Sequence, residues 1–185
     1  THFFNPPRYM KLLEIVPGPE TRPAVVERLA HVSEKILGKG IVLGKDTPNF
    51  IANRIGVFSM FLVVQAMEEL GLSIEAVDQL TGPVVGHPKS ASFRTVDLVG
   101  LDTLVHVANG IAENCPDDER KPLFVLPDFI NTMMENQWLG SKTGQGFYKK
   151  VKKEDGSSEI LSLDLQSMDY RPRQKAAFAT LELTK

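Results

Sequence analysis

One long segment of the chain, residues 47–70, contains an apolar stretch that must be covered on several sides. Asp46 or Thr47 can cap a helix here and Pro48 suits its first turn, so we expect the helix to run to the end of this segment. Its middle is apolar nearly all round, with Phe58, Met60, Phe61, Leu62, Val63 and Val64. The most apolar part, residues 55–64, is about half as long as a membrane-spanning helix. The segment therefore predicts a buried helix in a mainly α fold, or a subunit interface, and no membrane span.

The composition is that of an ordinary globular chain. The 185 residues are 42% hydrophobic and 24% charged, which is enough for one sizeable core with an appendage. A formal net charge of -2, without a dense basic run, argues against nucleic acid or an anionic membrane as the main partner. The single Cys115 excludes an internal disulfide and suits a reducing compartment. We expect a cytoplasmic protein, or a mitochondrial or peroxisomal one if the source is eukaryotic.

Helix and turn signals follow one another along the rest of the chain. The glycines of residues 38–44 do not form a phosphate-binding loop, because the third stands one position late for G-x-G-x-x-G. The pattern instead predicts a helix end that runs into a strand. The elements expected are a helix over 21–38, a strand over 41–43, helices over 74–80, 93–99, 102–111 and 127–137, a glycine-rich turn over 140–146, a hairpin over 149–163 and a linker over 169–173.

The opening segment contains a histidine and a carboxylate whose spacing can bring them together. In an extended strand Glu14 shares a face with Leu12 and Val16, so its carboxylate lies in an apolar row. A carboxylate there is costly unless it is paired, and a turn at residues 6–7 would fold His2 back against it. Such a pair leaves one imidazole nitrogen to take or give a proton, as in a general base. From spacing alone, a solvated histidine and a strand-end glutamate are the commoner situation.

Four motifs in this order resemble those of the 3-hydroxyacyl-CoA dehydrogenase family. They are His2-Phe3-Phe4-Asn5-Pro6 with residues 10–14, then residues 45–54, 100–102 and 142–148. The resemblance runs from Thr1 to about Tyr148 and implies the C-terminal, substrate-side part of such an enzyme. The fold implied is a 6-phosphogluconate-dehydrogenase-C-terminal-like helical bundle with short edge strands. In the family this bundle packs on a Rossmann domain, which we expect to be absent from this chain.

The resemblance divides the chain into three segments. Residues 1–20 would end the catalytic strand segment that joins the missing NAD domain, and residues 21–148 would form the helical domain. Residues 149–185 would form a hairpin and linker tail, similar to the connection in longer members that continue into an enoyl-CoA hydratase. Because the chain begins with Thr1 inside a motif, we expect a piece of a multifunctional fatty-acid oxidation enzyme.

The resemblance also implies an activity and the residues that carry it. The reaction is NAD-dependent oxidation of (3S)-3-hydroxyacyl-CoA to 3-ketoacyl-CoA in fatty-acid β-oxidation. His2 would remove the hydroxyl proton, Glu14 would orient His2, and Asn53 would hydrogen-bond the substrate oxygen. Asn5 and Lys142 would contact NAD, and no metal is expected. The partners implied are an acyl-CoA substrate, the chain's own upstream Rossmann domain and a second copy in a homodimer.

Two alternatives remain open. The chain can be a non-catalytic substrate-binding and dimerisation module, since His2 stands next to the chain end and no G-x-G-x-x-G follows a strand. We therefore expect the isolated chain to be inactive. It can also be the helical domain of another NAD-dependent hydroxyacid dehydrogenase, against which the motif from His2 to Glu14 argues. Residues 90–92 depart from the usual family pattern, so no acyl-chain preference follows from them.

Overall fold

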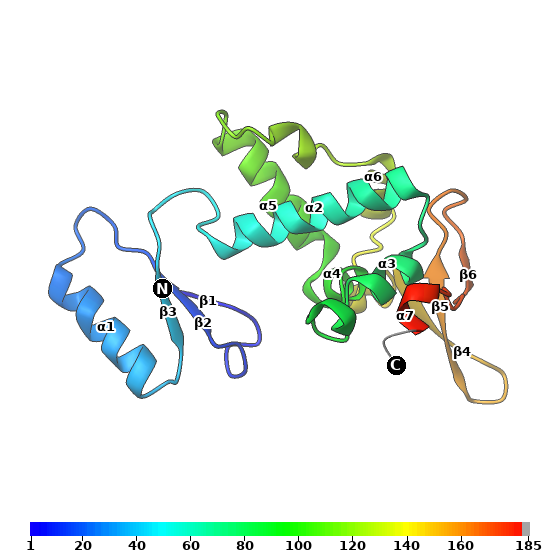
Figure 1. Ribbon diagram of the computed structural model, residues 1–185, viewed down its shortest axis with the longest axis horizontal. Helices are drawn as coiled ribbons and strands as arrows, with labels where there is room; N and C mark the ends of the chain where they lie inside the picture. The colour runs from blue at the N-terminus through cyan, green and yellow to red at the C-terminus, as the bar shows by residue number, and fades with distance from the viewer. Residues whose placement is uncertain (183–185) are drawn as a thin grey trace. The chain divides into compact units, whose positions relative to one another are not determined.

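The computed structural model describes residues 1–182 and divides into two compact units, which meet in the sequence between Gly56 and Val57. The first unit contains the opening strands and one helix, and the second is mainly helical with a small sheet. Figure 1 labels these elements along the chain. None of the helices in the described residues is both long enough and apolar enough to cross a bilayer.

The first unit is built on a three-stranded sheet with the order β1 (His2–Phe3), β2 (Leu12–Ile15), β3 (Gly40–Leu43). Strand β1 is antiparallel to β2, whereas β2 and β3 are parallel. Parallel neighbours need a crossover connection, and α1 (Pro23–Lys35) provides it and packs on both strands. The unit is therefore a β-α-β crossover with one added antiparallel strand.

The apolar side chains in and just after α1 are only partly covered. Val25 is 38% exposed, Leu29 is 40% exposed and Ile36 is 73% exposed. Leu43 at the end of β3 is also 63% exposed. Sheets with parallel strands are normally covered on both faces, so this amount of exposed apolar surface is typical of part of a larger α/β layer.

The long helix begins later than the sequence predicted. Helix α2 (Ala52–Leu70) ends as expected, but a start at Asp46 or Thr47 was wrong. Asn49 and Phe50 have φ angles of 59° and 51°, in the left-handed region, so a right-handed helix cannot pass through them. The orphan amides that follow are capped by a side chain distant in sequence, which local helix signals do not reveal.

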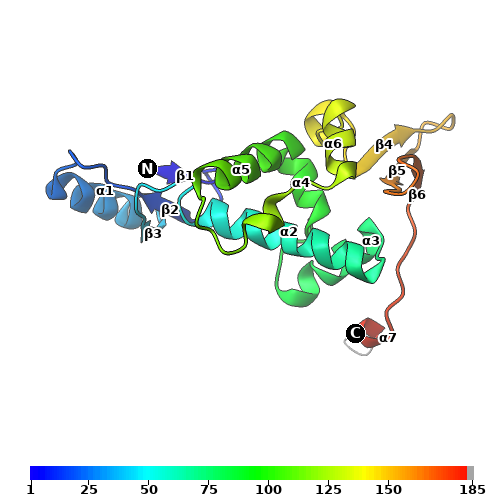
Figure 2. The same cartoon turned by 90° about the horizontal axis from the view of Figure 1, so that it is seen from above.

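The second unit combines the body of α2 with α3 (Ile74–Leu80), α4 (Phe93–Val99), α5 (Leu101–Asn114) and α6 (Asp128–Glu135). Figure 1 shows α5 crossing α2, and Figure 2 shows the two helices next to each other. The buried side chains of these helices form one core, in which each large residue contributes about 1.5–3 kcal/mol. Shorter elements complete the unit: the 3-10 helices η1 (Pro83–Val85), η2 (Lys121–Phe124) and η3 (Ser141–Thr143), and α7 (Ala179–Glu182).

A second sheet closes the unit, with β4 (Tyr148–Lys152), β5 (Ser158–Leu163) and β6 (Tyr170–Pro172) antiparallel in this order. The hairpin predicted from the sequence is confirmed. The linker predicted over residues 169–173 is wrong, because β6 pairs with β5 there. The Tyr170 hydroxyl donates to the Gly146 carbonyl at 2.6 Å, which ties β6 to the glycine-rich turn.

The two units do not coincide with the segments 1–20, 21–148 and 149–185 that the motifs suggested. Those segments stay a prediction about how the parts of a longer protein work. Within the expected tail, residues 183–185 lie outside the described residues.

Candidate active site

The expected pairing of His2 with Glu14 is present. The two residues stand opposite each other in the β1–β2 register, and His2 Nδ1 lies 2.7 Å from Glu14 Oε2. The Glu14 side chain is only 1% exposed, whereas that of His2 is 29% exposed. The carboxylate is therefore enclosed and the imidazole remains accessible.

The second oxygen of Glu14 binds the start of α2. Glu14 Oε1 accepts hydrogen bonds from the backbone N–H groups of Ile51 at 3.1 Å and Ala52 at 2.8 Å. Burial acts to raise the pKa of Glu14, but the hydrogen bonds from His2, Ala52 and Ile51 together outweigh it and leave the pKa below its ordinary value. Glu14 is thus ionised at neutral pH and joins the catalytic strand to the helix that follows.

Two aromatic rings hold the His2 imidazole in place. The ring centroid of His2 lies 4.5 Å from that of Phe4 and 5.7 Å from that of Phe50. A neutral imidazole whose Nδ1–H donates to a carboxylate has an unprotonated Nε2. Within the described residues Nε2 has no hydrogen bond, so the arrangement offers a proton acceptor on the accessible edge of the ring.

Asn53 and Asn5 lie in the same unit as this pair. Asn53 is half-buried in the first turn of α2, one residue after the amide of Ala52 that Glu14 binds. Asn5 is exposed in the turn that follows β1. Neither side chain has a hydrogen bond within the part of the chain that the structure describes, so both amides are available to a ligand.

Lys39 contributes to the same unit and was not identified from the sequence. It is 8% exposed, and its Nζ donates to the carbonyl of Pro7 and, at 2.6 Å, to that of Met10. These bonds fix the loop between β1 and β2, and hence the strand that carries His2. A lysine between two glycines gave no signal for this role, because its partners lie about 30 residues earlier in the chain.

Lys142 lies in the second unit, in η3. Its Nζ donates to both carboxylate oxygens of Asp102, at 2.5 and 2.6 Å, and the Lys142 bond lowers the pKa of Asp102. An ammonium group has three donors, so one of them remains for a further acceptor. The sequence singled out Gly100-Leu101-Asp102 and the Lys142 motif separately, and the structure joins them.

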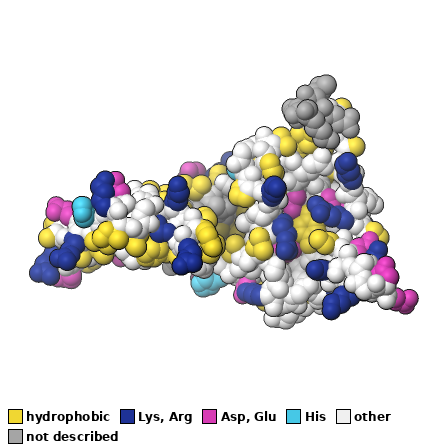
Figure 3. Space-filling view, turned by 90° about the horizontal axis from the view of Figure 1, so that it is seen from below, with side chains coloured by type: hydrophobic (Ala, Val, Ile, Leu, Met, Phe, Trp, Pro, Cys, Tyr) yellow, Lys and Arg dark blue, Asp and Glu magenta, His cyan; other side chains and the backbone are white. Residues whose placement is uncertain are grey.

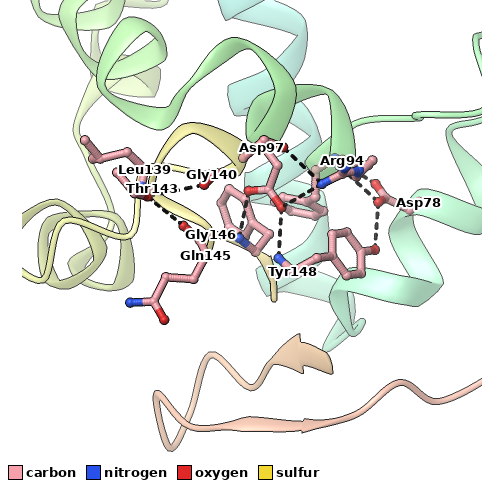
Figure 4. Close-up of polar contacts among 12 residues, drawn as sticks. Asp78, Arg94, Asp97, Leu139, Gly140, Thr143, Gln145, Gly146 and Tyr148 are labelled. Carbon is pink, nitrogen blue, oxygen red and sulfur yellow. Dashed lines mark hydrogen bonds and ion pairs between the residues drawn. The ribbon is translucent and has the colours of Figure 1, made fainter. Parts of the chain in front are cut away.

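Asp97 fixes the glycine-rich turn of the same motif (Figure 4). Its two oxygens accept the backbone N–H groups of Phe147 at 2.8 Å and Tyr148 at 2.9 Å, and Asp97 is 2% exposed. A Cβ on Gly146 would overlap the Asp97 carboxylate and lie 2.6 Å from the Gly140 Cα. The buried Asp97 carboxylate therefore requires a glycine directly before Phe147 and Tyr148. The sequence did not single out Asp97.

The Asp97 carboxyl should make stability depend on pH. Burial raises the pKa of Asp97 to about 6, despite the two N–H bonds that lower it. An unfolded Asp titrates near 4, so between about pH 4 and 6 the folded state binds more protons and stability falls as pH rises. We expect this component, about 2–3 kcal/mol, to vanish in Asp97→Asn.

Urea unfolding of both proteins from pH 4 to 7 measures the effect, because carboxyls that do not interact with Asp97 cancel in the difference between them. The free energy of unfolding of the parent relative to Asp97→Asn should decrease across this window. A difference that is constant with pH would contradict the raised pKa.

The chain resembles known proteins along its whole length. Residues 50–150 match the family model described as 3-hydroxyacyl-CoA dehydrogenase, C-terminal domain. Residues 1–47 match a second model, described as 3-hydroxyacyl-CoA dehydrogenase, NAD binding domain. A Bacillus subtilis protein named "Probable 3-hydroxyacyl-CoA dehydrogenase" is 49% identical over all of this chain and 23% of its own length. A Deinococcus radiodurans protein of the same name is 50% identical over 83% of this chain and 43% of its own. The chain thus spans less than half of these relatives.

A solved structure of a protein named as a dehydrogenase also resembles this chain. The crystal structure of (S)-3-hydroxybutyryl-CoA dehydrogenase from Ralstonia eutropha superposes with a TM-score of 0.67 at 28% identity, over 78% of this chain and 49% of that chain.

The match of residues 1–47 corrects one expectation. We expected the dinucleotide-binding domain to be absent, but the first unit matches the model of that domain and contains a β-α-β crossover. The chain therefore includes a piece of the NAD-binding layer. A short crossover without a glycine-rich phosphate loop gave too weak a signal in the sequence.

Proposed function

This chain belongs to the 3-hydroxyacyl-CoA dehydrogenase family, and from this premise we propose that it forms the proton-transfer and substrate-side part of an enzyme of fatty-acid β-oxidation. The reaction is oxidation of (3S)-3-hydroxyacyl-CoA to 3-ketoacyl-CoA. The observation that carries the proposal is the bond between His2 Nδ1 and the buried Glu14 carboxylate, which leaves Nε2 as an accessible proton acceptor.

The chemistry follows from the contacts of these side chains. His2 Nε2 takes the proton of the substrate hydroxyl, and the charge that develops on the imidazole is stabilised by Glu14. Asn53 donates its side-chain N–H to the substrate oxygen. Because Glu14 Oε1 also holds the first amides of α2, one carboxylate sets the positions of both His2 and the helix that carries Asn53.

Loss of the hydrogen on the carbinol carbon requires a hydride acceptor, which NAD supplies when bound. The donor set fits such a cofactor at its reacting end, since the free amide of Asn5 follows the strand that carries His2. Lys142 is the second proposed contact and has one donor left beside Asp102.

Several finer features belong to the same proposal. We infer that the second unit is the 6-phosphogluconate-dehydrogenase-C-terminal-like bundle and that two copies associate as a dimer. We also propose that the chain works within a longer multifunctional protein that carries an enoyl-CoA hydratase as the further module. The bacterial relatives favour a cytoplasmic location.

The test is NADH formation from (3S)-3-hydroxyacyl-CoA by the 185-residue chain and by the same region joined to its natural upstream sequence. We expect activity in the longer protein and none in the shorter one. A longer protein that is folded and binds NAD, but is inactive with short and long acyl chains, would favour the non-catalytic substrate-binding module instead.

A further inference from the structure

A cavity of about 780 Å³ lies in the second unit, far in sequence from His2 and Glu14. Helices α3 and α4, strand β4 and residues 173–176 contribute to its wall. Five basic side chains line it: Lys89, Arg94, Lys150, Arg173 and Lys175. Figure 3 shows a hollow with an apolar floor on this face, with Lys and Arg side chains gathered around it. Because the whole chain has a net charge of -2, this gathering does not reflect a generally basic protein.

The two carboxylates in the wall already accept hydrogen bonds from other groups. Glu75 accepts two bonds from Arg171, at 2.7 and 3.1 Å, and one from the Gln174 N–H at 3.0 Å. Asp78 accepts the Tyr148 hydroxyl at 2.7 Å and the backbone N–H groups that begin α4, of which the shortest is 2.7 Å. Neither carboxylate forms an ion pair with the five basic side chains, and Arg171 already balances the charge of Glu75.

The basic side chains, in contrast, make few polar contacts. Within residues 1–182, the Nζ groups of Lys89, Lys150 and Lys175 make no hydrogen bond or ion pair. Arg173 lies 5.4 Å above the Tyr148 ring, and Arg94 makes only a 3.4 Å contact with a serine hydroxyl and a 3.8 Å approach to Asp97. Positive charge from four separate chain segments therefore faces one cavity.

We propose that this cavity binds a phosphorylated small molecule of nucleotide size. Phosphate oxygens accept several charge-assisted hydrogen bonds, and Lys and Arg are the side chains that bind them. The volume lies within the range of small-molecule sites, and Tyr148 with Ile160 offers an apolar wall to the body of the ligand. The site is independent of the proposed dehydrogenase activity, since it uses none of His2, Glu14 and Asn53.

Isothermal titration of the 185-residue chain with pyrophosphate and with ADP tests the proposal. We expect both to bind, and more weakly as salt rises. Lys89→Ala and Lys150→Ala should each weaken binding about tenfold, the effect of losing one charge-assisted contact. Lys152→Ala is the matched control: both lysines are exposed on the same strand, but Lys152 lies outside the cavity, so its loss should change the affinity less than twofold.

The two probes separate the possible sources of phosphate. Tighter binding of ADP would assign a nucleotide, and equal binding would assign recognition of the phosphate groups alone. Absence of binding by both probes at low salt would overturn the proposal. So would equal weakening by Lys150→Ala and Lys152→Ala, because it would show only the effect of overall charge.

Discussion

Replacing Glu14 with Gln in the region joined to its upstream sequence should lower kcat for 3-hydroxyacyl-CoA oxidation by about 10²–10⁴-fold. Glu14 accepts hydrogen bonds from three donors, one on His2 and two at the start of α2. A glutamine has only one carbonyl oxygen, so its NH₂ group must face either the imidazole or the helix amides. Facing His2, it would favour the tautomer that carries the proton on Nε2, which cannot act as the base.

His2→Gln should lower kcat by a similar factor, and the double variant should be no worse than the poorer single one, because the two residues act as a unit. Glu20→Gln is the matched control, since it makes the same change at an exposed residue of the same unit. Steady-state NADH formation measures the parent and the four variants, with circular dichroism to confirm folding. A folded Glu14→Gln enzyme with kcat within twofold of the parent would remove Glu14 from the catalytic role.

Arg171→Met is expected to lower the free energy of unfolding by about 3–5 kcal/mol. The guanidinium binds both oxygens of Glu75, which is 3% exposed, and the substitution leaves that carboxylate buried with no cation. Burial raises the pKa of Glu75, but the bonds from Arg171 and Gln174 outweigh it and lower the pKa to about 2. The pair therefore stabilises the fold above about pH 4.5, and this contribution is lost as pH falls towards 2.

Glu75→Gln should cost less than Arg171→Met, since it leaves no buried charge unpaired. Lys153→Met is the control: it breaks an ion pair of similar length with Glu159, but both partners are partly exposed, so the loss should be below about 1 kcal/mol. Urea denaturation at pH 7 compares the three variants. Equal losses for Arg171→Met and Lys153→Met would show that the buried pair does not hold β6 to α3.

The sequence predicted the features that local chemistry determines. His2 and Glu14 were expected to pair because alternation in a strand placed the carboxylate in an apolar row, and the register of β1 and β2 confirms the pairing. A helix was expected over residues 74–80, and α3 spans them, with the hydroxyl of Ser73 accepting the N–H of Ala76. In both cases the decisive residues lie close together in the sequence.

The features that were missed depend on partners far apart in the chain. The start of α2 is set by Glu14, 37 and 38 residues before the amides that it binds. Strand β6 was predicted to be a linker. The partner of its Arg171 is Glu75, which lies 96 residues away, so the sequence around β6 gave no sign of this contact. The role of Asp97 was invisible for the same reason, since its partners Phe147 and Tyr148 lie 50 and 51 residues later. No local pattern carries such information.

The role of Glu14 in preparing His2 as the base is tested most directly by determining the tautomer of His2. The ring-nitrogen chemical shifts of the ¹⁵N-labelled 185-residue chain, measured by NMR at neutral pH, report it. We expect a proton on Nδ1, held by Glu14, and an unprotonated Nε2. Glu14→Gln should lose this preference, whereas Glu20→Gln should retain it. A parent protein with the proton on Nε2, or with the same mixture of tautomers as Glu14→Gln, would contradict the claim that Glu14 prepares His2 as the base.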